Sequence, residues 1–171
     1  MIRVVALLRA VNVGGTGKMP MADLKDICEG LGFENVWTYI ASGNVVFDTE
    51  TDAVGAQAAL SGKVDEYAGK TVGLFIVTAS QLDQILAENP FADKAGNAST
   101  VLFLGRKTKA YDIKGLRGQT DEIVRLGPQV IYCHYPSGMG CSKLKMGAAD
   151  YGTVRNMNTV AKLTDMVRQS L

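Results

Sequence analysis

Short apolar segments and longer amphipathic segments alternate along the first half of the chain, and their order leaves few folds open. Residues 2–11 are almost all apolar and rich in β-branched side chains, as in a strand buried on both faces. Apolar residues then recur at i, i+3, i+4 and i+7 from Leu24, which predicts an amphipathic helix. Pro20 suits the start of this helix, and Gly32 can end it in a left-handed conformation.

Five further elements follow in this half. We predict strands at 36–41 and 45–47 around a turn at 42–44, a helix at 52–67, a strand at 72–78, and a helix that is capped at Ser80 and ends at Asn89-Pro90. The order strand–helix–strand–strand–helix–strand is that of a ferredoxin-like sandwich, with an antiparallel sheet and helices on one face. We therefore expect an α+β protein whose residues 1–88 form a ferredoxin-like subdomain.

The second half repeats part of this pattern. It predicts a strand at 100–104, a short helix at 111–118, a hairpin of 122–126 and 130–135, a glycine-rich stretch at 136–145 and a last helix at 158–169. We expect residues 89–171 to form a second, smaller α+β subdomain packed against the first. It is either a degraded repeat of the first half or a complementary subdomain, and the sequence does not separate the two.

Composition and charge exclude several classes of protein. Apolar residues make up 47% of the chain, and the formal net charge is +1, so no global field draws it to nucleic acid or to anionic membranes. No apolar run approaches the roughly 18 residues that span a bilayer, and three cysteines give no disulfide framework. These features predict a cytoplasmic protein that does not bind membranes.

The residue types needed for common catalytic and metal sites are scarce. His134 is the only histidine, and its neighbour Cys133 would point to the opposite face of a strand, which argues against a metal site. No G-x-S-x-G motif is present, and Cys141 has no visible partner base, so a hydrolase triad lacks support. We predict no metal and no cofactor.

Residues 12–18 form a glycine-rich loop between the first strand and the first helix. A Walker phosphate loop would need a glycine at Asn12 and a hydroxyl residue at Met19, so that motif fails. Gly14, Gly15 and Lys18 beside a helix N-terminus can still bind an anion through backbone N–H groups. The alternative is an ordinary strand-to-helix connection.

Two segments near the C-terminus carry similar features. Gly140, Ser142 and Lys143 lie in a second glycine-rich loop. Arg155, Asn156 and Asn158 lie at the predicted start of the last helix, where at least one side chain should act as a helix cap and the others would remain for a ligand. Charge is uneven along the chain, so either its solvated helix faces differ in charge or both chain ends contribute to one basic concavity.

Several segments together resemble the bacterial family known as domain of unknown function 1697. They are residues 6–15, 18–21, 31–33, 38–47, 89–91, 142–144 and 153–160. Three positions depart from the family pattern, because Ala10 and Val11 stand where it has glycine and isoleucine, and Met157 stands where it has tryptophan. The resemblance implies a small α+β cytosolic protein with related halves, and it brings no substrate, cofactor or catalytic residue.

Our leading hypothesis is a binding site for a small anionic or phosphate-bearing ligand where these loops meet. Lysine and arginine would pair with anionic oxygens, glycine would allow close approach, and the other polar side chains would orient the ligand. The candidate residues are Arg9, Asn12, Gly14, Gly15, Lys18, Ser42, Asn44, Gly140, Ser142, Lys143, Arg155, Asn156 and Asn158. Whether the protein is an enzyme, and its oligomeric state, stay open.

The sequence leaves two alternative hypotheses for the function. The first is a non-catalytic protein-interaction module, which could form a homodimer. The second is weak binding of single-stranded nucleic acid, since a ferredoxin-like sheet can present aromatic residues that stack on bases. The strand at 72–78 carries only Phe75, and Trp37 and Tyr39 lie on another strand, so the residues of the sheet do not support this function.

Overall fold

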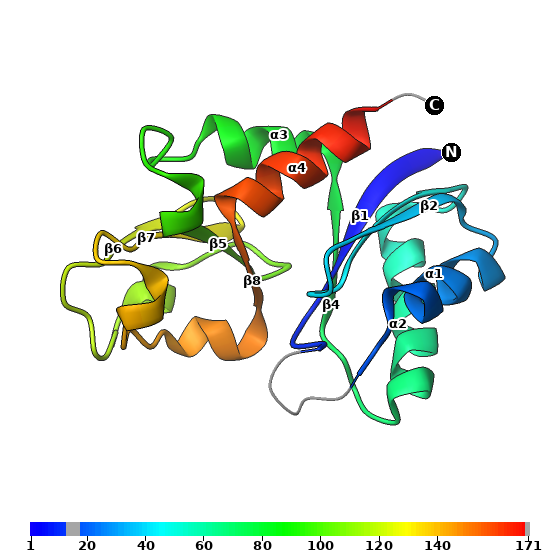
Figure 1. Ribbon diagram of the computed structural model, residues 1–171, viewed down its shortest axis with the longest axis horizontal. Coiled ribbons are helices and arrows are strands. Elements are labelled where there is room, and N and C mark those ends of the chain that lie inside the picture. The colour runs from blue at the N-terminus through cyan, green and yellow to red at the C-terminus, as the bar shows by residue number, and fades with distance from the viewer. Residues whose placement is uncertain (13–17, 170–171) are drawn as a thin grey trace. The chain divides into compact units, whose positions relative to one another are not determined.

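The computed structural model describes residues 1–12 and 18–169, which form two four-stranded antiparallel sheets and four α-helices (Figure 1). The chain is therefore a mixed α+β protein. It divides into two compact units, residues 1–82 with the end of the chain from Leu163, and residues 83–162. The helices α3 (Ala79–Ala87) and α4 (Met157–Arg168) each contribute to both units, which a single boundary at residue 88 does not describe.

The sheet of the first unit has the strand order β2-β3-β1-β4, with every pair of neighbours antiparallel. Its strands are β1 (Ile2–Leu8), β2 (Glu34–Tyr39), β3 (Asn44–Thr49) and β4 (Leu74–Thr78). Leu8 at the end of β1 pairs with Leu74 at the start of β4, and Leu7 pairs with Asn44 at the start of β3. Three connections of the chain therefore meet at the same end of this sheet.

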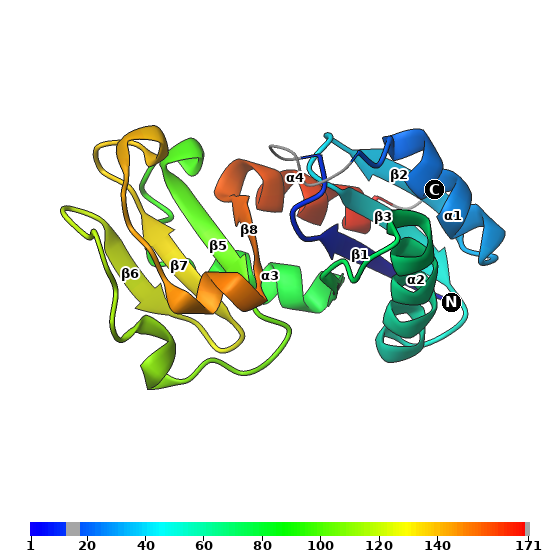
Figure 2. The ribbon, with the colours of Figure 1, turned by 90° about the horizontal axis from the view of Figure 1, so that it is seen from below.

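Two helices, α1 (Met21–Gly30) and α2 (Ala53–Ala68), cover one face of the sheet (Figures 1 and 2). Alternate residues of the central strands point into the core that they form, because successive strand side chains face opposite sides. Phe47 of β3 is fully buried there, and its ring stacks on Phe33 with centroids 4.3 Å apart. The predicted left-handed end of the first helix is confirmed at Gly32, where φ is 80°.

The start of α3 differs from the prediction. The helix begins at Ala79, and Thr78 caps it rather than Ser80. The Thr78 hydroxyl accepts a hydrogen bond from the Gln81 N–H at 3.3 Å, and the Gln81 side chain accepts one from the Thr78 N–H at 2.9 Å. This reciprocal pair is a capping box, and it joins β4 to α3 without a loop.

The sheet of the second unit has the order β6-β7-β5-β8, which repeats the order of the first sheet with each strand number raised by four. Its strands are β5 (Ser99–Phe103), β6 (Ile123–Leu126), β7 (Val130–His134) and β8 (Thr153–Asn156). Figure 2 shows this sheet from below. Strand β8 differs from the prediction, which places two of its four residues, Arg155 and Asn156, at the start of the last helix.

The second unit has four short 3-10 turns: the first precedes β5, the second takes the place that α1 has in the first unit, and the last two take the place of α2. They are η1 (Gly96–Ala98), η2 (Ala110–Ile113), η3 (Met139–Cys141) and η4 (Gly147–Tyr151). The predicted helix at 111–118 is therefore wrong. Gly115 and Gly118 both have φ of 67°, a left-handed conformation that interrupts a right-handed helix. Within residues 1–12 and 18–169, no helix is long and apolar enough to span a membrane.

Candidate functional site

A cavity of about 540 Å³ lies in the first unit, at the end of the sheet where β1 finishes and β4 begins. Its walls come from residues 9–11 and 18–19 on the first connection, residues 67–68 at the end of α2, and residues 70–73 on the connection from α2 to β4. The Arg9 N–H donates a hydrogen bond to the Gly73 carbonyl at 2.7 Å, which holds the two connections together. The antiparallel pairing of β1 with β4 thus creates the cavity.

Three cationic side chains, Arg9, Lys18 and Lys70, line this cavity. None of the described lining residues is an aspartate or a glutamate. Gly73 allows the Arg9 side chain to cross the backbone closely, since a Cβ at Gly73 would lie 3.0 Å from the Cβ of Arg9. The cavity therefore has a positive lining, with Val11 and Met19 as its buried apolar part.

Tyr67 is the aromatic residue of the cavity wall. Its hydroxyl donates a hydrogen bond to Asp23 Oδ2 at 2.5 Å, which fixes the side chain. This hydrogen bond raises the pKa of Tyr67, so the phenol stays neutral at physiological pH. Asp23 lies in the first turn of α1, two residues after the helix begins, and its charge offsets part of the positive helix dipole there.

The side chain of Asn12 connects three parts of the backbone at this end of the sheet. Its Nδ2 donates to the carbonyls of Met19 and Ala41, both at 2.8 Å, and its Oδ1 accepts from the Met19 N–H at 2.8 Å. Asn12 therefore holds the site together, where we had expected it to orient a ligand. Gly14 and Gly15 lie outside the described residues.

Left-handed backbone conformations gather beside the cavity at residues other than glycine. Ala10, Asn12 and Ile40 have φ values of 54°, 56° and 49°. Such conformations cost about 1–3 kcal/mol each for residues with a side chain, and a β-branched residue such as Ile40 adopts them rarely. Strain of this kind is typical of functional sites.

Ser42 and Asn44 belong to the turn between β2 and β3. Asn44 is fully buried, and its Nδ2 donates to the Tyr39 carbonyl at 2.9 Å and to Ser42 Oγ at 3.1 Å. Gly43 has φ of 86°, and a Cβ there would lie 2.5 Å from Val11 Cγ2. These residues shape the turn that packs against the first connection.

The predicted loop at 137–143 belongs to the second unit. The Ser142 hydroxyl donates to Glu122, and its oxygen accepts from the Leu144 N–H at 3.1 Å. The hydrogen bonds from Ser142 and from the Thr120 N–H lower the pKa of Glu122 to about 2. Gly140 lies in η3, and the Lys143 carbonyl leaves no space for a Cβ at Gly118. Ser142 therefore stabilises the loop.

Arg155 lies in β8 rather than at an exposed helix entrance. It is buried, and it donates to Thr153 Oγ1 at 2.7 Å and to the Val154 carbonyl at 2.9 Å. Burial lowers its pKa to about 10. Asn156 caps α4, because its Oδ1 accepts the Thr159 N–H at 2.8 Å, which confirms the predicted cap. Asn158 is exposed and packs closely against Gly96.

Six candidate residues, from Gly140 to Asn158, thus lie in the second unit, while the cavity above lies in the first. Of the residues proposed from the sequence, the structure brings Arg9 and Lys18 together in that cavity, with Asn12 holding its backbone. A site shared by the loops of both units stays a prediction.

Lys70 and Tyr67 were missed by the sequence analysis. Their connection has no motif, because it carries neither a run of glycines nor a cluster of like charges. The available signal was topological, since the predicted strand order places the connection before the fourth strand beside the one after the first strand. Following that order would have brought Lys70 to Arg9 and Lys18.

The cysteines and the histidine do not form a reactive group in the described part of the chain. Cys28 and Cys133 are buried, and burial raises the pKa of Cys28 to about 12. His134 Nδ1 lies 3.2 Å from Ser99 Oγ and 3.0 Å from the Ala98 carbonyl oxygen. Among residues 1–12 and 18–169, no three histidine, cysteine, aspartate or glutamate side chains are grouped so that they could hold a metal ion.

Comparison with solved structures finds a similar fold in a conserved bacterial protein, SP0830 from Streptococcus pneumoniae. The TM-score is 0.80 and the identity 24%, and the match covers 98% of this chain and 99% of that chain. A search among curated proteins gives no match. The model of a protein family of unknown function, DUF1697, matches residues 1–132. The chain therefore belongs to the DUF1697 family.

Proposed function

We propose that the first unit binds a small anionic ligand, such as one carrying a phosphate group, in the cavity lined by Arg9, Lys18 and Lys70. The observation that carries the proposal is the lining itself, with three cations and no carboxylate among its described residues. A volume of about 540 Å³ lies within the range of roughly 300–1,000 Å³ that is typical of small-molecule sites.

The three cations differ in what they supply. An arginine guanidinium can donate two parallel hydrogen bonds to a phosphate or carboxylate, and a lysine acts as a mobile point charge. Arg9 is half-buried and held by its backbone hydrogen bond to Gly73, so it would fix the orientation of the anion. Lys18 and Lys70 are exposed and would close on the ligand from the two connections.

The position of the cavity also fits a ferredoxin-like fold for the first unit, which we infer as the finer description of this α+β half. Its support is the strand order β2-β3-β1-β4, with both helices of the strand–helix–strand units on one face. In that fold the connections after the first strand and before the last lie at the same end of the sheet, which is where the cations meet.

Thermal unfolding with added phosphate tests the proposal. A ligand that binds only the native state raises the melting temperature by mass action. We expect orthophosphate, pyrophosphate or a nucleoside phosphate to stabilise the wild-type protein, and the double variant Lys18→Gln/Lys70→Gln to lose this response. The control is Lys25→Gln/Lys63→Gln, which removes two exposed lysines outside the cavity.

Two results would contradict an anion site. Equal stabilisation of both double variants would show that the anions act through the bulk salt effect. A wild-type protein that none of the three anions stabilises would show that the cavity does not hold such a ligand.

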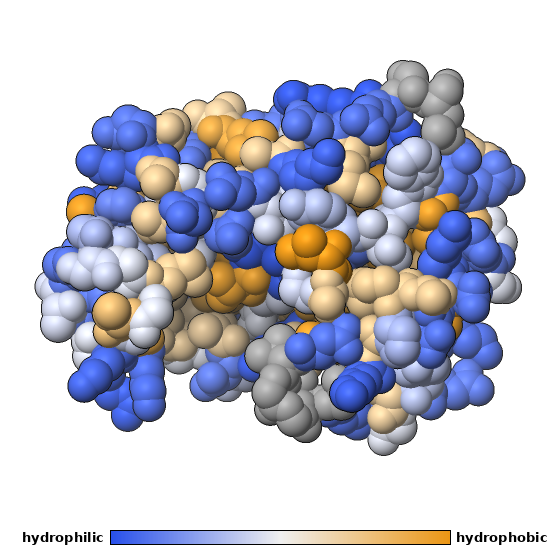
Figure 3. Space-filling view, in the orientation of Figure 1, coloured by the Kyte–Doolittle hydropathy of each residue, from blue (hydrophilic) through white to orange (hydrophobic). Residues whose placement is uncertain are grey.

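A protein-interaction module is a second candidate, and the edge strand β2 favours it. Trp37 on this strand is 52% exposed, and Ile40 follows the strand with an exposed side chain. Edge strands with exposed apolar residues tend to pair with other chains. On the face drawn in Figure 3, hydrophobic and hydrophilic residues are intermixed. Sedimentation of the wild-type protein and of Trp37→Ala tests this function, which predicts a dimer that the variant weakens.

A further inference from the structure

The second unit has its own cavity, of about 680 Å³, at the corresponding end of its sheet. Phe103 at the end of β5 pairs with Thr153 at the start of β8, as Leu8 pairs with Leu74 in the first unit. The segments after β5 and before β8 therefore lie side by side, and they form the walls. The lining residues are Leu104, Arg106, Tyr111, Asp112, Lys114, Gly147, Ala148, Asp150 and Tyr151.

Two exposed tyrosines distinguish this cavity. Tyr111 in η2 is 58% exposed and Tyr151 in η4 is 75% exposed, although aromatic residues usually bury most of their surface. They come from segments forty positions apart in the sequence and meet in one cavity wall. Lys109 Nζ lies 5.7 Å from the centroid of the Tyr111 ring, within range of a cation–π contact.

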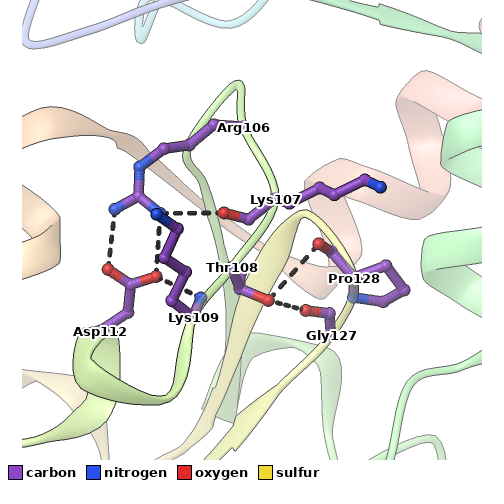
Figure 4. A network of polar contacts seen from close by, with 7 residues as sticks. All are labelled: Arg106, Lys107, Thr108, Lys109, Asp112, Gly127 and Pro128. Atoms are coloured by element: carbon purple, nitrogen blue, oxygen red, sulfur yellow. Dashed lines mark hydrogen bonds and ion pairs between the residues drawn. The ribbon is translucent and has the colours of Figure 1, made fainter.

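An ion pair gives this wall a fixed geometry (Figure 4). Arg106 donates to both oxygens of Asp112, at 2.7 and 2.9 Å, and Asp112 also accepts the Lys109 N–H at 2.7 Å. The hydrogen bonds from Arg106 keep the pKa of Asp112 below its ordinary value, so the carboxylate stays charged. Figure 4 shows the side chain of Lys107 extending away from the Arg106–Asp112 pair.

The second unit is also basic, unlike the first. Its sequence has 11 lysine and arginine residues against 7 aspartate and glutamate residues, a net charge of +4, whereas the first unit has 7 against 10, a net charge of −3. Arg117 and Lys145 place two further cationic residues side by side, since their backbones pair through hydrogen bonds of 3.1 and 2.8 Å, and Arg117 follows Lys114 of the cavity wall by three positions. We call Lys109, Lys114, Arg117 and Lys145 the basic strip.

We propose that this cavity and the basic strip bind single-stranded nucleic acid. Bases would stack on Tyr111 and Tyr151, and phosphates would lie along the basic strip, which is the combination that single-strand binding proteins use. A duplex hides the faces of its bases, so the exposed tyrosines favour a single strand. Asp150 in the lining repels phosphate and can accept a hydrogen bond from the amino group of a base, which places bases rather than phosphates in the cavity.

This site is independent of the anion cavity proposed in the first unit, and it does not use the face of either sheet. The tyrosines lie on 3-10 turns at the end of the strands. The aromatic motif of sheet-based RNA binding is therefore not required for it.

Fluorescence anisotropy with labelled single strands of about ten nucleotides, DNA and RNA, tests the role of the tyrosines. Base stacking on an aromatic side chain changes affinity by about 5-fold or more for each base, so we expect Tyr111→Ala/Tyr151→Ala to bind at least about 25-fold more weakly. Tyr111→Phe/Tyr151→Phe keeps both rings and should bind within about 2-fold of the wild-type protein. Val54→Ala, which truncates an exposed apolar side chain of the first unit, is the control.

The salt dependence tests the basic strip. Each phosphate contact to a single strand contributes about −0.7 to the slope of log K against log salt concentration. The triple variant Lys109→Gln/Lys114→Gln/Lys145→Gln should therefore flatten the slope by about 2. Lys25→Gln/Lys63→Gln should leave it unchanged. Circular dichroism of each variant checks that it is folded.

Four results would overturn the proposal. They are the absence of binding at low salt, full affinity of the folded double alanine variant, a duplex that binds as tightly as the single strand, and a mononucleotide that binds as tightly as the oligonucleotide. The last would assign the cavity to a free nucleotide.

Discussion

The two units share one strand order but line their cavities with different chemistry. In the first unit the cavity is bounded by the end of α2 and the approach to α1, and the charged residues among its described lining are all cations. In the second unit 3-10 turns replace both helices, and two tyrosines, two cations and two carboxylates line the cavity. The strand order sets where a cavity forms, and the segments that cover the sheet determine what it can bind.

A second likeness concerns how each cavity is held in place. In each unit a polar side chain that follows the first strand of the sheet donates a hydrogen bond to a backbone carbonyl in the turn between the second and third strands. Asn12 donates to the Ala41 carbonyl. In the second unit the Thr108 hydroxyl donates to the Gly127 carbonyl (Figure 4), and the Thr108 N–H donates to the Pro128 carbonyl at 3.0 Å. Different residue types thus perform the same task.

The largest expected effect tests whether the two units are separate in stability. Phe47→Ala removes a fully buried ring from the first unit and should cost about 3–5 kcal/mol of unfolding free energy. Ile131→Ala, in the core of the second unit, should cost about 2–5 kcal/mol. Hydrogen exchange should show that Phe47→Ala loses protection mainly in β1–β4 and Ile131→Ala mainly in β5–β8. Equal loss over both sheets in both variants would mean that the units unfold as one.

The hydrogen bonds of Asn12 and of Thr108 should contribute different amounts to the free energy of unfolding. Asn12→Ala loses three hydrogen bonds, so we expect a cost of about 2–3 kcal/mol. Thr108→Val loses the hydroxyl bond alone and should cost about 1 kcal/mol. Urea denaturation measures both. If Thr108→Val lowered the free energy of unfolding more than Asn12→Ala, the number of hydrogen bonds that each side chain makes would not determine its contribution to stability.

A smaller effect concerns the strain beside the first cavity. Ala10→Gly should stabilise the protein by about 0.5–1 kcal/mol, because glycine adopts the left-handed conformation at φ 54° without the penalty that alanine pays. The same substitution at Ala148, a buried residue of the second unit without positive φ, should destabilise it. A melting temperature that falls in Ala10→Gly would show that Ala10 carries no such strain.

Glu122 should give the second unit a contribution to stability that depends on pH. The folded pKa of Glu122 is about 2, below its ordinary value of 4.5, so its charge stabilises the fold above pH 4.5. This contribution is lost as the pH falls from about 4.5 through 2. Glu122→Gln should therefore lose less stability than the wild-type protein over that window, in urea denaturation at several pH values. Glu50→Gln, at an exposed carboxylate, should follow the wild-type curve.

The sequence predicted the elements of the first unit well because each had a strong local pattern. The apolar stripe from Leu24 and the apolar run at 45–47 reflect the buried core directly, so the local pattern was enough. In the second unit the pattern was weaker. The four residues of β8 follow a glycine and end at the helix cap Asn156, so the strand is too short to show an alternation. Gly115 and Gly118 interrupt the segment where a helix was predicted.

The candidate site was only partly predictable for a related reason. Arg9 and Lys18 lie beside a glycine-rich loop that stands out in the sequence, whereas Lys70 becomes part of the site only through the pairing of β1 with β4. The internal roles of Asn12 and Ser142 were not predictable either, because a polar residue in a loop has the same sequence pattern whether it bonds the backbone or a ligand.

The chain passes from the first unit to the second inside α3 and returns inside α4, so the second unit is one uninterrupted insert of residues 83–162. To produce either unit alone, the chain must be cut within α3 and again within α4. Each cut leaves backbone N–H and C=O groups without their helical partners and exposed to water. Recombination at these crossings would be poorly tolerated. The halves should therefore have been inherited together rather than exchanged with other proteins.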